Sequence, residues 1–187
     1  RKLVLVLKIF FHSKVYKSHI NGKSILEIGA GNLNHLKFEK NFDYYDVVEP
    51  KTFLLKRADK SSIDLIRNTY KSIDEISGEN IYEKIIAIAV LEHLDELDNF
   101  LKKVSKLLKP KGRFIVQIPA EGEFLWWLSW RLTTGVDFWL KYNLDYGVIM
   151  RYEHINTAKN IISLLDKNFY ILNSYSYPFN FKNCRFY

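Results

Sequence analysis

The chain has 187 residues, of which 48% are hydrophobic and 26% charged, and this balance predicts a single globular domain with a sizeable core. Its one cysteine excludes a disulfide framework and favours a reducing, cytoplasmic location. The net charge of +7 fits a lysine-rich surface, an anionic substrate or an acidic membrane surface, but without a basic block or a zinc-finger or RNA-binding motif we expect no nucleic acid partner.

Short apolar runs alternate with helical segments over the first 118 residues. We expect buried strands at 24–28, 45–48, 85–90 and 113–118, with a weaker candidate at 69–72. Strands that alternate with helices predict a Rossmann-like, doubly wound and mostly parallel sheet with helices on both faces. The predicted fold class is therefore α/β.

The segment between the last two of these strands predicts an amphipathic helix. Its apolar stripe recurs at helical spacing and consists of Leu97, Phe100, Leu101, Val104, Leu107 and Leu108. Asp95 is the expected cap, and Pro110 with Gly112 is expected to end the helix.

The pattern changes after the fifth expected strand, where all four tryptophans occur in what we interpret as an aromatic insertion. A helix capped by Thr157 or Asn156 is expected next, followed by a last strand near 169–177 that ends at Pro178. The single predicted domain then has four parts: a helical lead-in at 1–22, a core at 23–119, the insertion at 120–156, and a C-terminal helix and strand at 157–187.

The first strand ends in a glycine pair, in the stretch SILEIGAGNLNHL. A strand that ends in Gly-x-Gly and opens a helix lets the backbone approach a polar ligand closely. A dinucleotide fingerprint needs a further glycine, and Asn34 occupies that position, so a pyrophosphate ligand is disfavoured. Glu49 lies twenty residues after Gly29, where a carboxylate can accept both hydroxyls of a ribose. The alternative is a tight turn with a solvated acid.

Three pieces of the sequence resemble class I S-adenosylmethionine-dependent methyltransferases. ILEIGAG resembles their motif I, VVEP resembles their second acidic motif, and residues 83–119 resemble their fourth strand, following helix and fifth strand. The resemblance covers residues 23–119 and implies a methyltransferase that uses S-adenosylmethionine and yields S-adenosylhomocysteine.

The resemblance implies nine cofactor-binding residues: Glu27, Gly29, Ala30, Gly31, Glu49, Ser72, Ile73, Asp74 and Ala87. Glu27 and the residues from Gly29 to Gly31 would lie around the methionine part of the cofactor. Glu49 would hold the ribose hydroxyls. The segment from Ser72 to Asp74 would flank the adenine, and Ala87 would lie under the sulfonium. The sequence departs from the family pattern at Leu33, the third glycine position of motif I, and at Ala87, where a polar residue is common. Any catalytic base must therefore come from elsewhere.

Methyl transfer releases a neutral thioether, so positioning and desolvation can supply most of the acceleration and no metal is required. A base helps if the acceptor is a hydroxyl, and His93 in LEHL is one candidate. The alternative for His93 is a histidine at a helix start that bonds to the backbone. Glu92 and His93 are adjacent and point apart on a helix, so we expect no metal site.

The segment MRYEHIN brings Arg151, Glu153 and His154 together just before a helix. We expect Glu153 or His154 to face the acceptor and Arg151 to bind an anionic group, although a capping and ion-pair cluster is an alternative. The stretches IPAEGEFLWWLSWRLTTG and LDYGVIMRYEHIN resemble a bacterial methyltransferase subgroup loosely associated with glycan pathways. The expected acceptor is a hydroxyl or amine on a small molecule or carbohydrate.

The stretch EFLWWLSWRL is apolar nearly all around a helix but too short to cross a membrane. A lid over the acceptor, a packing or dimer face, and an anchor for peripheral membrane contact are three open interpretations. The sequence leaves the oligomeric state open. Two other functions also remain: a nucleotide-dependent oxidoreductase, and a non-catalytic methyltransferase-like binding module.

Overall fold

The computed structural model describes residues 22–118, 143, 154–174, 177–178 and 185–186. The expected helical lead-in and most of the aromatic insertion therefore lie outside the described residues. The chain divides into two compact units, Arg1–Ile88 with Lys102–Gln117, and Ala89–Leu101 with Ile118–Tyr187. No helix of the described residues has the length and apolar character needed to cross a membrane.

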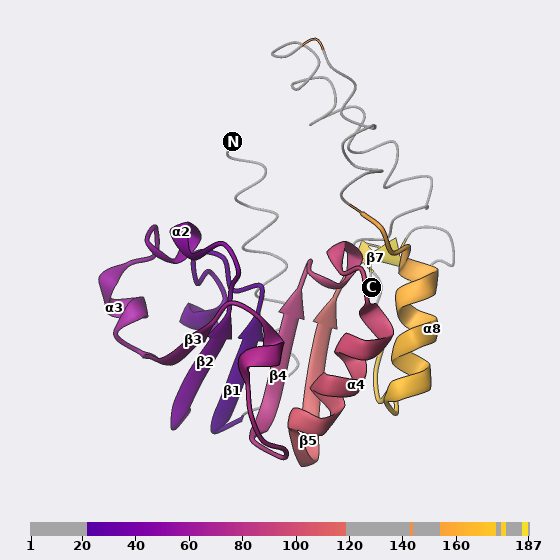
Figure 1. The fold of residues 1–187 in the computed structure, drawn as a ribbon, viewed down its shortest axis with the longest axis horizontal. Helices are drawn as coiled ribbons and strands as arrows, with labels where there is room; N and C mark the ends of the chain where they lie inside the picture. The colour runs from indigo at the N-terminus through magenta and orange to yellow at the C-terminus, as the bar shows by residue number, and fades with distance from the viewer. Residues whose placement is uncertain (1–21, 119–142, 144–153, 175–176, 179–184, 187) are drawn as a thin grey trace. The chain divides into compact units, whose positions relative to one another are not determined.

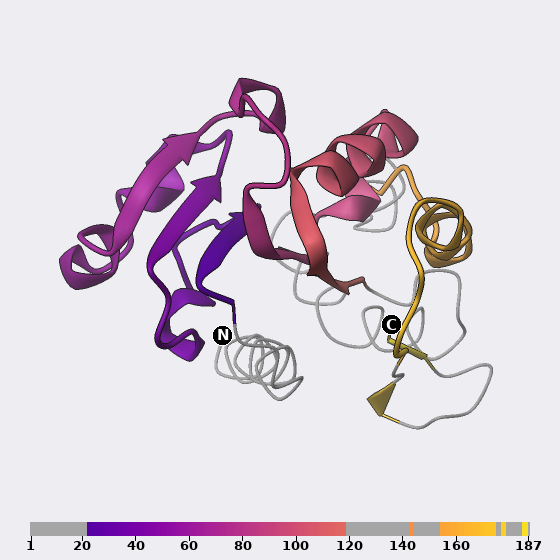
Figure 2. The ribbon, with the colours of Figure 1, turned by 90° about the horizontal axis from the view of Figure 1, so that it is seen from below.

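The first unit is built on a five-stranded sheet in which every pair of neighbouring strands is parallel (Figure 1). Its strands are β1 (Ser24–Ile28), β2 (Tyr44–Val48), β3 (Ile66–Tyr70), β4 (Tyr82–Ile88) and β5 (Leu108–Gln117), in the order β3-β2-β1-β4-β5. Figure 2 shows successive strands rotated relative to one another, the usual twist of such sheets. The predicted α/β class with a parallel sheet is confirmed.

The strand order reverses direction at β1. The chain proceeds from β1 to β2 and β3 on one side, and returns to β4 and β5 on the other. Right-handed crossovers then place the two sets of connections on opposite faces of the sheet. The carboxyl ends of β1 and β4 form the topological switch point, where open α/β sheets bind their ligands.

The core of the sheet follows from the apolar run of β1, whose five residues are all buried. A strand buried on both faces needs a nearly continuous apolar sequence, which is why this strand was predictable. The surrounding core cluster consists of Ile25, Ala30, Leu33, Leu36, Tyr45, Val47 and Ile86. The cluster thus joins β1, β2 and β4 to the loop that follows β1.

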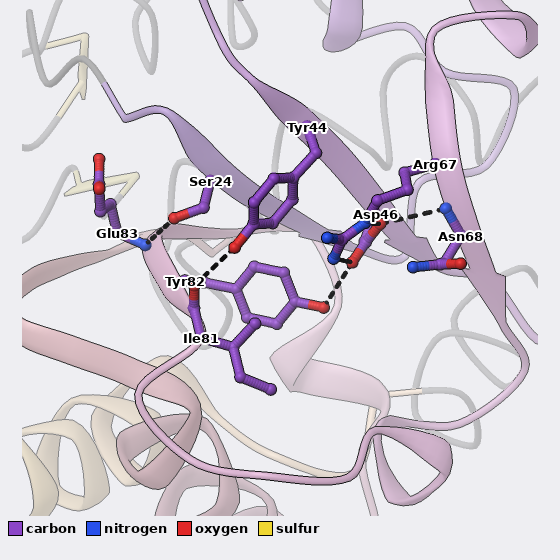
Figure 3. A network of polar contacts seen from close by, with 8 residues as sticks. All are labelled: Ser24, Tyr44, Asp46, Arg67, Asn68, Ile81, Tyr82 and Glu83. Carbon is purple, nitrogen blue, oxygen red and sulfur yellow. Dashed lines mark hydrogen bonds and ion pairs between the residues drawn. The ribbon is translucent and has the colours of Figure 1, made fainter.

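A polar network anchors β2 within the sheet (Figure 3). Asp46 is fully buried and forms a bidentate ion pair with Arg67, whose Nε lies 3.0 Å from Asp46 Oδ1. The Tyr82 hydroxyl also donates to this carboxylate, at 2.7 Å, and the Arg67 guanidinium stacks over the Tyr44 ring at 3.6 Å. These contacts satisfy the buried charge and tie β2 to β3 and β4.

Helical segments connect the strands and complete the described chain. They are η1 (Leu36–Phe38), α2 (Thr52–Leu55), α3 (Lys60–Ile63), η2 (Ile73–Glu75), η3 (Leu91–His93), α4 (Leu97–Leu107) and α8 (Ala158–Asn168). The expected helices thus correspond to α4 and α8, and Thr157 rather than Asn156 caps α8, its side chain accepting from the Asn160 amide.

Three local predictions differ from the structure. The weak strand expected at 69–72 is β3, at Ile66–Tyr70, because this strand is largely exposed and carries little apolar signal. Residues 169–174 of the last expected strand are in no strand, and only β6 (Tyr177–Pro178) pairs, with β7 (Arg185–Phe186). The glycine pair opens turns and η1 instead of a regular helix.

The expected stop signal of α4 lies inside the next strand. The helix ends at Leu107, and β5 already contains Pro110 and Gly112. The register between β4 and β5 shifts there, and Lys111 has φ +66°, the geometry of a bulge. A Cβ on Gly112 would lie 2.8 Å from the Lys109 carbonyl oxygen, so this bulge requires glycine.

Candidate cofactor site and histidine cluster

The glycine pair forms a left-handed turn at the carboxyl end of β1. Gly29 has φ +68° and Gly31 has φ +54°, which glycine adopts without steric cost. The amides of Gly29 and Ala30 donate to the Val48 carbonyl, at 2.8 and 3.4 Å, and the Gly31 amide donates to Glu49 Oε2 at 2.7 Å. Because these three amides all donate within the protein, none of the three is available to a pyrophosphate.

The space around the position of a side chain at Gly31 is open. A Cβ on Gly31 would meet no atom within 4 Å, so only the backbone conformation requires glycine there. Open space at a switch point suits a ligand that lies against the loop without a phosphate for the amides to hold. The loop residues therefore fit an adenosine ligand with an amino-acid tail.

Leu33, at the third glycine position of motif I, also has a left-handed backbone, with φ +61°. Such a conformation costs an L-residue about 1–2 kcal/mol. Burial of its side chain, which is 3% exposed within the core cluster, offsets this cost. The same left-handed residue prevents a regular helix from starting after the glycines, which corrects that expectation.

Glu49 is fixed at the carboxyl end of β2 by three hydrogen bonds. Its amide donates to the Tyr70 carbonyl at 2.8 Å, while its carboxylate accepts from the amides of Gly31 and Lys51 at 2.7 and 2.8 Å. Each carboxylate oxygen retains a second lone-pair direction. The side chain is therefore preorganised to accept further hydrogen bonds, as two ribose hydroxyls would donate.

Glu27 is buried near the end of β1. Its carboxyl accepts a hydrogen bond of 2.8 Å from the Tyr45 hydroxyl, a partner that sequence reasoning missed. Burial foremost raises the pKa of Glu27, the Tyr45 hydrogen bond opposes this increase and the charges of Glu39 and Glu49 add to it, so that the pKa reaches about 8. The negative charge of Glu49 thus disfavours ionisation of the Glu27 carboxyl.

Glu39, unlike Glu27, has cationic or potentially cationic partners. Lys84 Nζ lies 2.7 and 2.8 Å from its two oxygens, and His35 Nε2 lies 2.8 Å from Oε1. Burial raises the pKa of Glu39, but hydrogen bonds from His35 and Lys84 outweigh burial and keep the pKa below its ordinary value. This acid is thus neutralised from within the protein.

The residues expected beside the adenine have different environments. Ile73 is buried, whereas the Asp74 carboxylate is exposed and is held by the Ser72 hydroxyl at 3.0 Å and Lys103 Nζ at 2.7 Å. The Lys103 hydrogen bond foremost lowers the pKa of Asp74. Ala87 is fully buried in β4 and pairs with Ile28 of β1.

In the second unit, the structure joins the LEHL and EHIN motifs. The rings of His93 and His154 meet edge to face, with centroids 4.6 Å apart. The amides of Ile155 and Asn156 donate to the Glu92 carbonyl at 2.9 and 3.1 Å. The histidines expected as separate candidates therefore form one cluster, while Glu153, the third candidate, lies outside the described residues.

Asn156 holds this arrangement, a role that its expected capping function did not include. Its side-chain amide donates to the carbonyls of Leu91 and Leu94, at 3.1 and 2.6 Å, and its own oxygen accepts from Asn160 at 3.0 Å. A buried amide with several partners fixes the segment that carries His154 against η3.

Burial sets the charge state of the histidine cluster. Burial and, to a smaller extent, the charge of His93 lower the pKa of His154 to about 4. His154 is therefore neutral at pH 7. Burial also raises the pKa of Glu92, whose Oε2 has no hydrogen-bond partner within the described residues. In the part of the chain that the structure describes, no three His, Cys, Asp or Glu side chains are grouped to hold a metal ion.

Comparison with known proteins agrees with this geometry. A family model described as a methyltransferase domain matches residues 9–170. Pavine N-methyltransferase from Thalictrum flavum subsp. glaucum is 27% identical over 104 residues, which cover 52% of this chain and 29% of that protein. The match thus spans less than a third of the curated relative's length.

Solved structures share the fold. The N-methyltransferase NodS from Bradyrhizobium japonicum has a TM-score of 0.65 at 14% identity, covering 96% of this chain and 90% of the other. Its complex with S-adenosylhomocysteine has a TM-score of 0.59 at 16% identity, with 86% and 72% covered. A methyltransferase from Thermotoga maritima, described as a possible histamine N-methyltransferase, has a TM-score of 0.61 at 16% identity, with 89% and 72% covered.

The chain belongs to the methyltransferase domain family.

Proposed function

We propose that the chain methylates an amine on a small-molecule acceptor. The observation that carries the cofactor side is the glycine turn with Glu49 at the switch point of the sheet, where the loop amides are already occupied. The amine is supported by relatives whose names state N-methylation. A sugar hydroxyl is the second candidate, supported by the resemblance of the insertion to a bacterial subgroup associated with glycans.

The proposed cofactor-binding residues each hold one part of the cofactor in place. S-adenosylmethionine, when bound, supplies an electrophilic methyl group with a neutral leaving group. Glu49 binds the ribose hydroxyls, the glycine turn and Glu27 contact the methionine part, and Asp74 contacts the adenine. Because Ala87 carries no polar group, the described core supplies no base there, and proton transfer falls to the histidine cluster.

His93 and His154 are the proposed residues on the acceptor side, together with Glu153. They follow β4 and precede α8, and η3 begins three residues after the carboxyl end of β4. A neutral His154 can accept a hydrogen bond from an amine or hydroxyl and orient its lone pair. Arg151 would bind an anionic part of the acceptor.

The test compares His154→Ala with Ile155→Ala, a matched control at the next, half-exposed position. We measure transfer of labelled methyl from S-adenosylmethionine to panels of small amines and of sugars, and S-adenosylhomocysteine affinity by calorimetry. His154→Ala should lower transfer about 100-fold or more, as loss of a proton acceptor does, without changing cofactor affinity.

Three results would overturn parts of this proposal. Unchanged transfer by His154→Ala would return the histidine cluster to a structural role. Transfer to sugars but not to amines would select the second candidate. Cofactor binding with no transfer to any panel compound would favour the non-catalytic binding module.

The wider setting is proposed on sequence grounds alone. We propose a single cytoplasmic domain with no nucleic acid partner. The tryptophan-rich stretch is a lid, an interface or a peripheral membrane anchor, and its deletion tested against vesicles and by sedimentation distinguishes these roles.

A further inference from the structure

The connection between β2 and β3 exposes large apolar side chains. It carries the short helices α2 and α3, which lie on the side of the sheet formed by β2 and β3 (Figures 1 and 2). Phe53, Ile63 and Leu65 are 53%, 40% and 55% exposed. Leu55 and Ala58 of the same connection, by contrast, pack against the core cluster. The α2–α3 connection therefore satisfies the core with one set of apolar side chains and presents a second set to the outside.

Basic side chains alternate with these exposed apolar ones. The exposed cations of the connection are Lys51, Lys56, Arg57 and Lys60. Within the described residues, none of these four cations forms an ion pair. With two acids, Asp59 and Asp64, the four cations leave the connection a net charge of +2. The Arg57 guanidinium also lies 5.5 Å from the centroid of the exposed Phe53 ring, so that a cation and an aromatic ring are presented together.

This combination fits a partner that is anionic at its surface and apolar beneath. An anionic phospholipid membrane has this layering, because its headgroups attract cations and its interface takes up apolar and aromatic side chains. A protein partner fits less well, since three apolar side chains are few beside the roughly 20–30 residues that each side of a specific interface contributes. Nucleic acid also fits less well, because phosphate contacts make no use of aliphatic side chains such as Ile63 and Leu65.

We propose that the α2–α3 connection docks the protein onto anionic phospholipid membranes. Phe53, Ile63 and Leu65 enter the interface, and the four cations bind the lipid headgroups. The docking is peripheral, because α2 and α3 have four residues each. Since α2 begins three residues after Glu49, docking brings the carboxyl end of β2 to the membrane surface.

Cosedimentation of the full chain with vesicles tests the role of the cations. The native chain should bind vesicles that contain phosphatidylserine at least about tenfold more tightly than vesicles of phosphatidylcholine alone, and salt should weaken the binding. Lys56→Gln with Lys60→Gln should weaken it about tenfold or more, since each cation near an anionic surface contributes about fivefold. The matched control is Lys106→Gln with Lys159→Gln, which removes the same charge from exposed positions of α4 and α8 and should cost much less.

The same measurement tests the apolar side chains. Ile63→Ser with Leu65→Ser should weaken binding to phosphatidylserine vesicles about tenfold, because two side chains that enter the interface become polar. Ile171→Ser with Leu172→Ser is the matched control, since these residues are 41% and 50% exposed and lie outside the connection; it should bind as the native chain does. All four positions are exposed, so each variant should fold, and thermal melting checks this.

The outcomes decide between membrane docking and the other partners. Failure of the native chain to bind phosphatidylserine vesicles, or equal binding to both kinds of vesicle, would overturn the proposal. Binding that both variants of the connection retain would also overturn it and assign the membrane contact to another part of the chain. A dimer that Ile63→Ser with Leu65→Ser dissociates, or an RNA oligonucleotide that displaces the vesicles, would replace the membrane with that partner.

Discussion

Single side chains decide how the charges beneath the glycine turn are tolerated. Lys84 and Glu39 are both almost fully buried, with side-chain exposures of 2% and 5%. A buried ion pair contributes little relative to an apolar pair, yet removal of one partner leaves a charge without compensation. Lys84 and Glu39 therefore matter most when only one of them is replaced.

Glu39→Leu should lower the free energy of unfolding by about 3–5 kcal/mol, because it leaves the Lys84 ammonium buried without a carboxylate. The double variant with Lys84→Met should recover most of this loss. The measurement is urea unfolding at pH 7. Lys109→Met is the control, since its pair with Glu83 is half-exposed and should contribute much less than the buried pair. Equal losses for Glu39→Leu and Lys109→Met would contradict this account.

At the scale of elements, two short segments determine the geometry of the candidate sites. The turns after β1 carry the glycine pair and end in η1, and the segment before α8 is bound to η3. Neither the turns after β1 nor the segment before α8 is part of a regular helix or strand. Side chains and left-handed residues, rather than element propensity, hold both segments in place.

Asn156→Ala should destabilise the contact between η3 and the start of α8. Two carbonyls lose their side-chain donor, so the expected loss is about 2 kcal/mol in the free energy of unfolding. Asn160→Ala is the matched control, because Asn160 contributes only its hydrogen bond to the Asn156 side chain and should cost about 1 kcal/mol or less. Urea unfolding checks both, and a larger loss for Asn160→Ala would contradict the role assigned to Asn156.

For the whole molecule, the strands with strong apolar signals were predictable and the weakly apolar edge strand was less so. β1 matches its predicted bounds because both of its faces are buried. The predicted bounds of β3 were a few residues too late in the chain, because three of its five residues are exposed and give little apolar signal. Residues 169–174 alternate like a strand, but Tyr170 is 88% exposed and the segment pairs with no strand of the described chain. A strand requires a partner as well as a pattern.

The candidate cofactor site was predictable where it depends on local spacing. The glycine pair and Glu49 follow their strands directly, so sequence distance was enough. Tyr45 was missed because its contact with Glu27 depends on the register of β1 against β2, in which Ile25 pairs with Tyr45. The contact of His93 with His154 was missed because the two residues lie 61 positions apart in the sequence, and no local pattern brings them together.

The glycine turn and Glu49 are the proposed binding site of S-adenosylmethionine. The most direct test of this site is calorimetric titration of the native chain and of Glu49→Ala with S-adenosylhomocysteine, with NADH as the comparison ligand. The native chain should bind one S-adenosylhomocysteine and no NADH, and Glu49→Ala should bind at least tenfold more weakly, a loss of about 1.4 kcal/mol. Absence of both heat and thermal shift at millimolar S-adenosylhomocysteine, or unchanged affinity in Glu49→Ala, would contradict the claim.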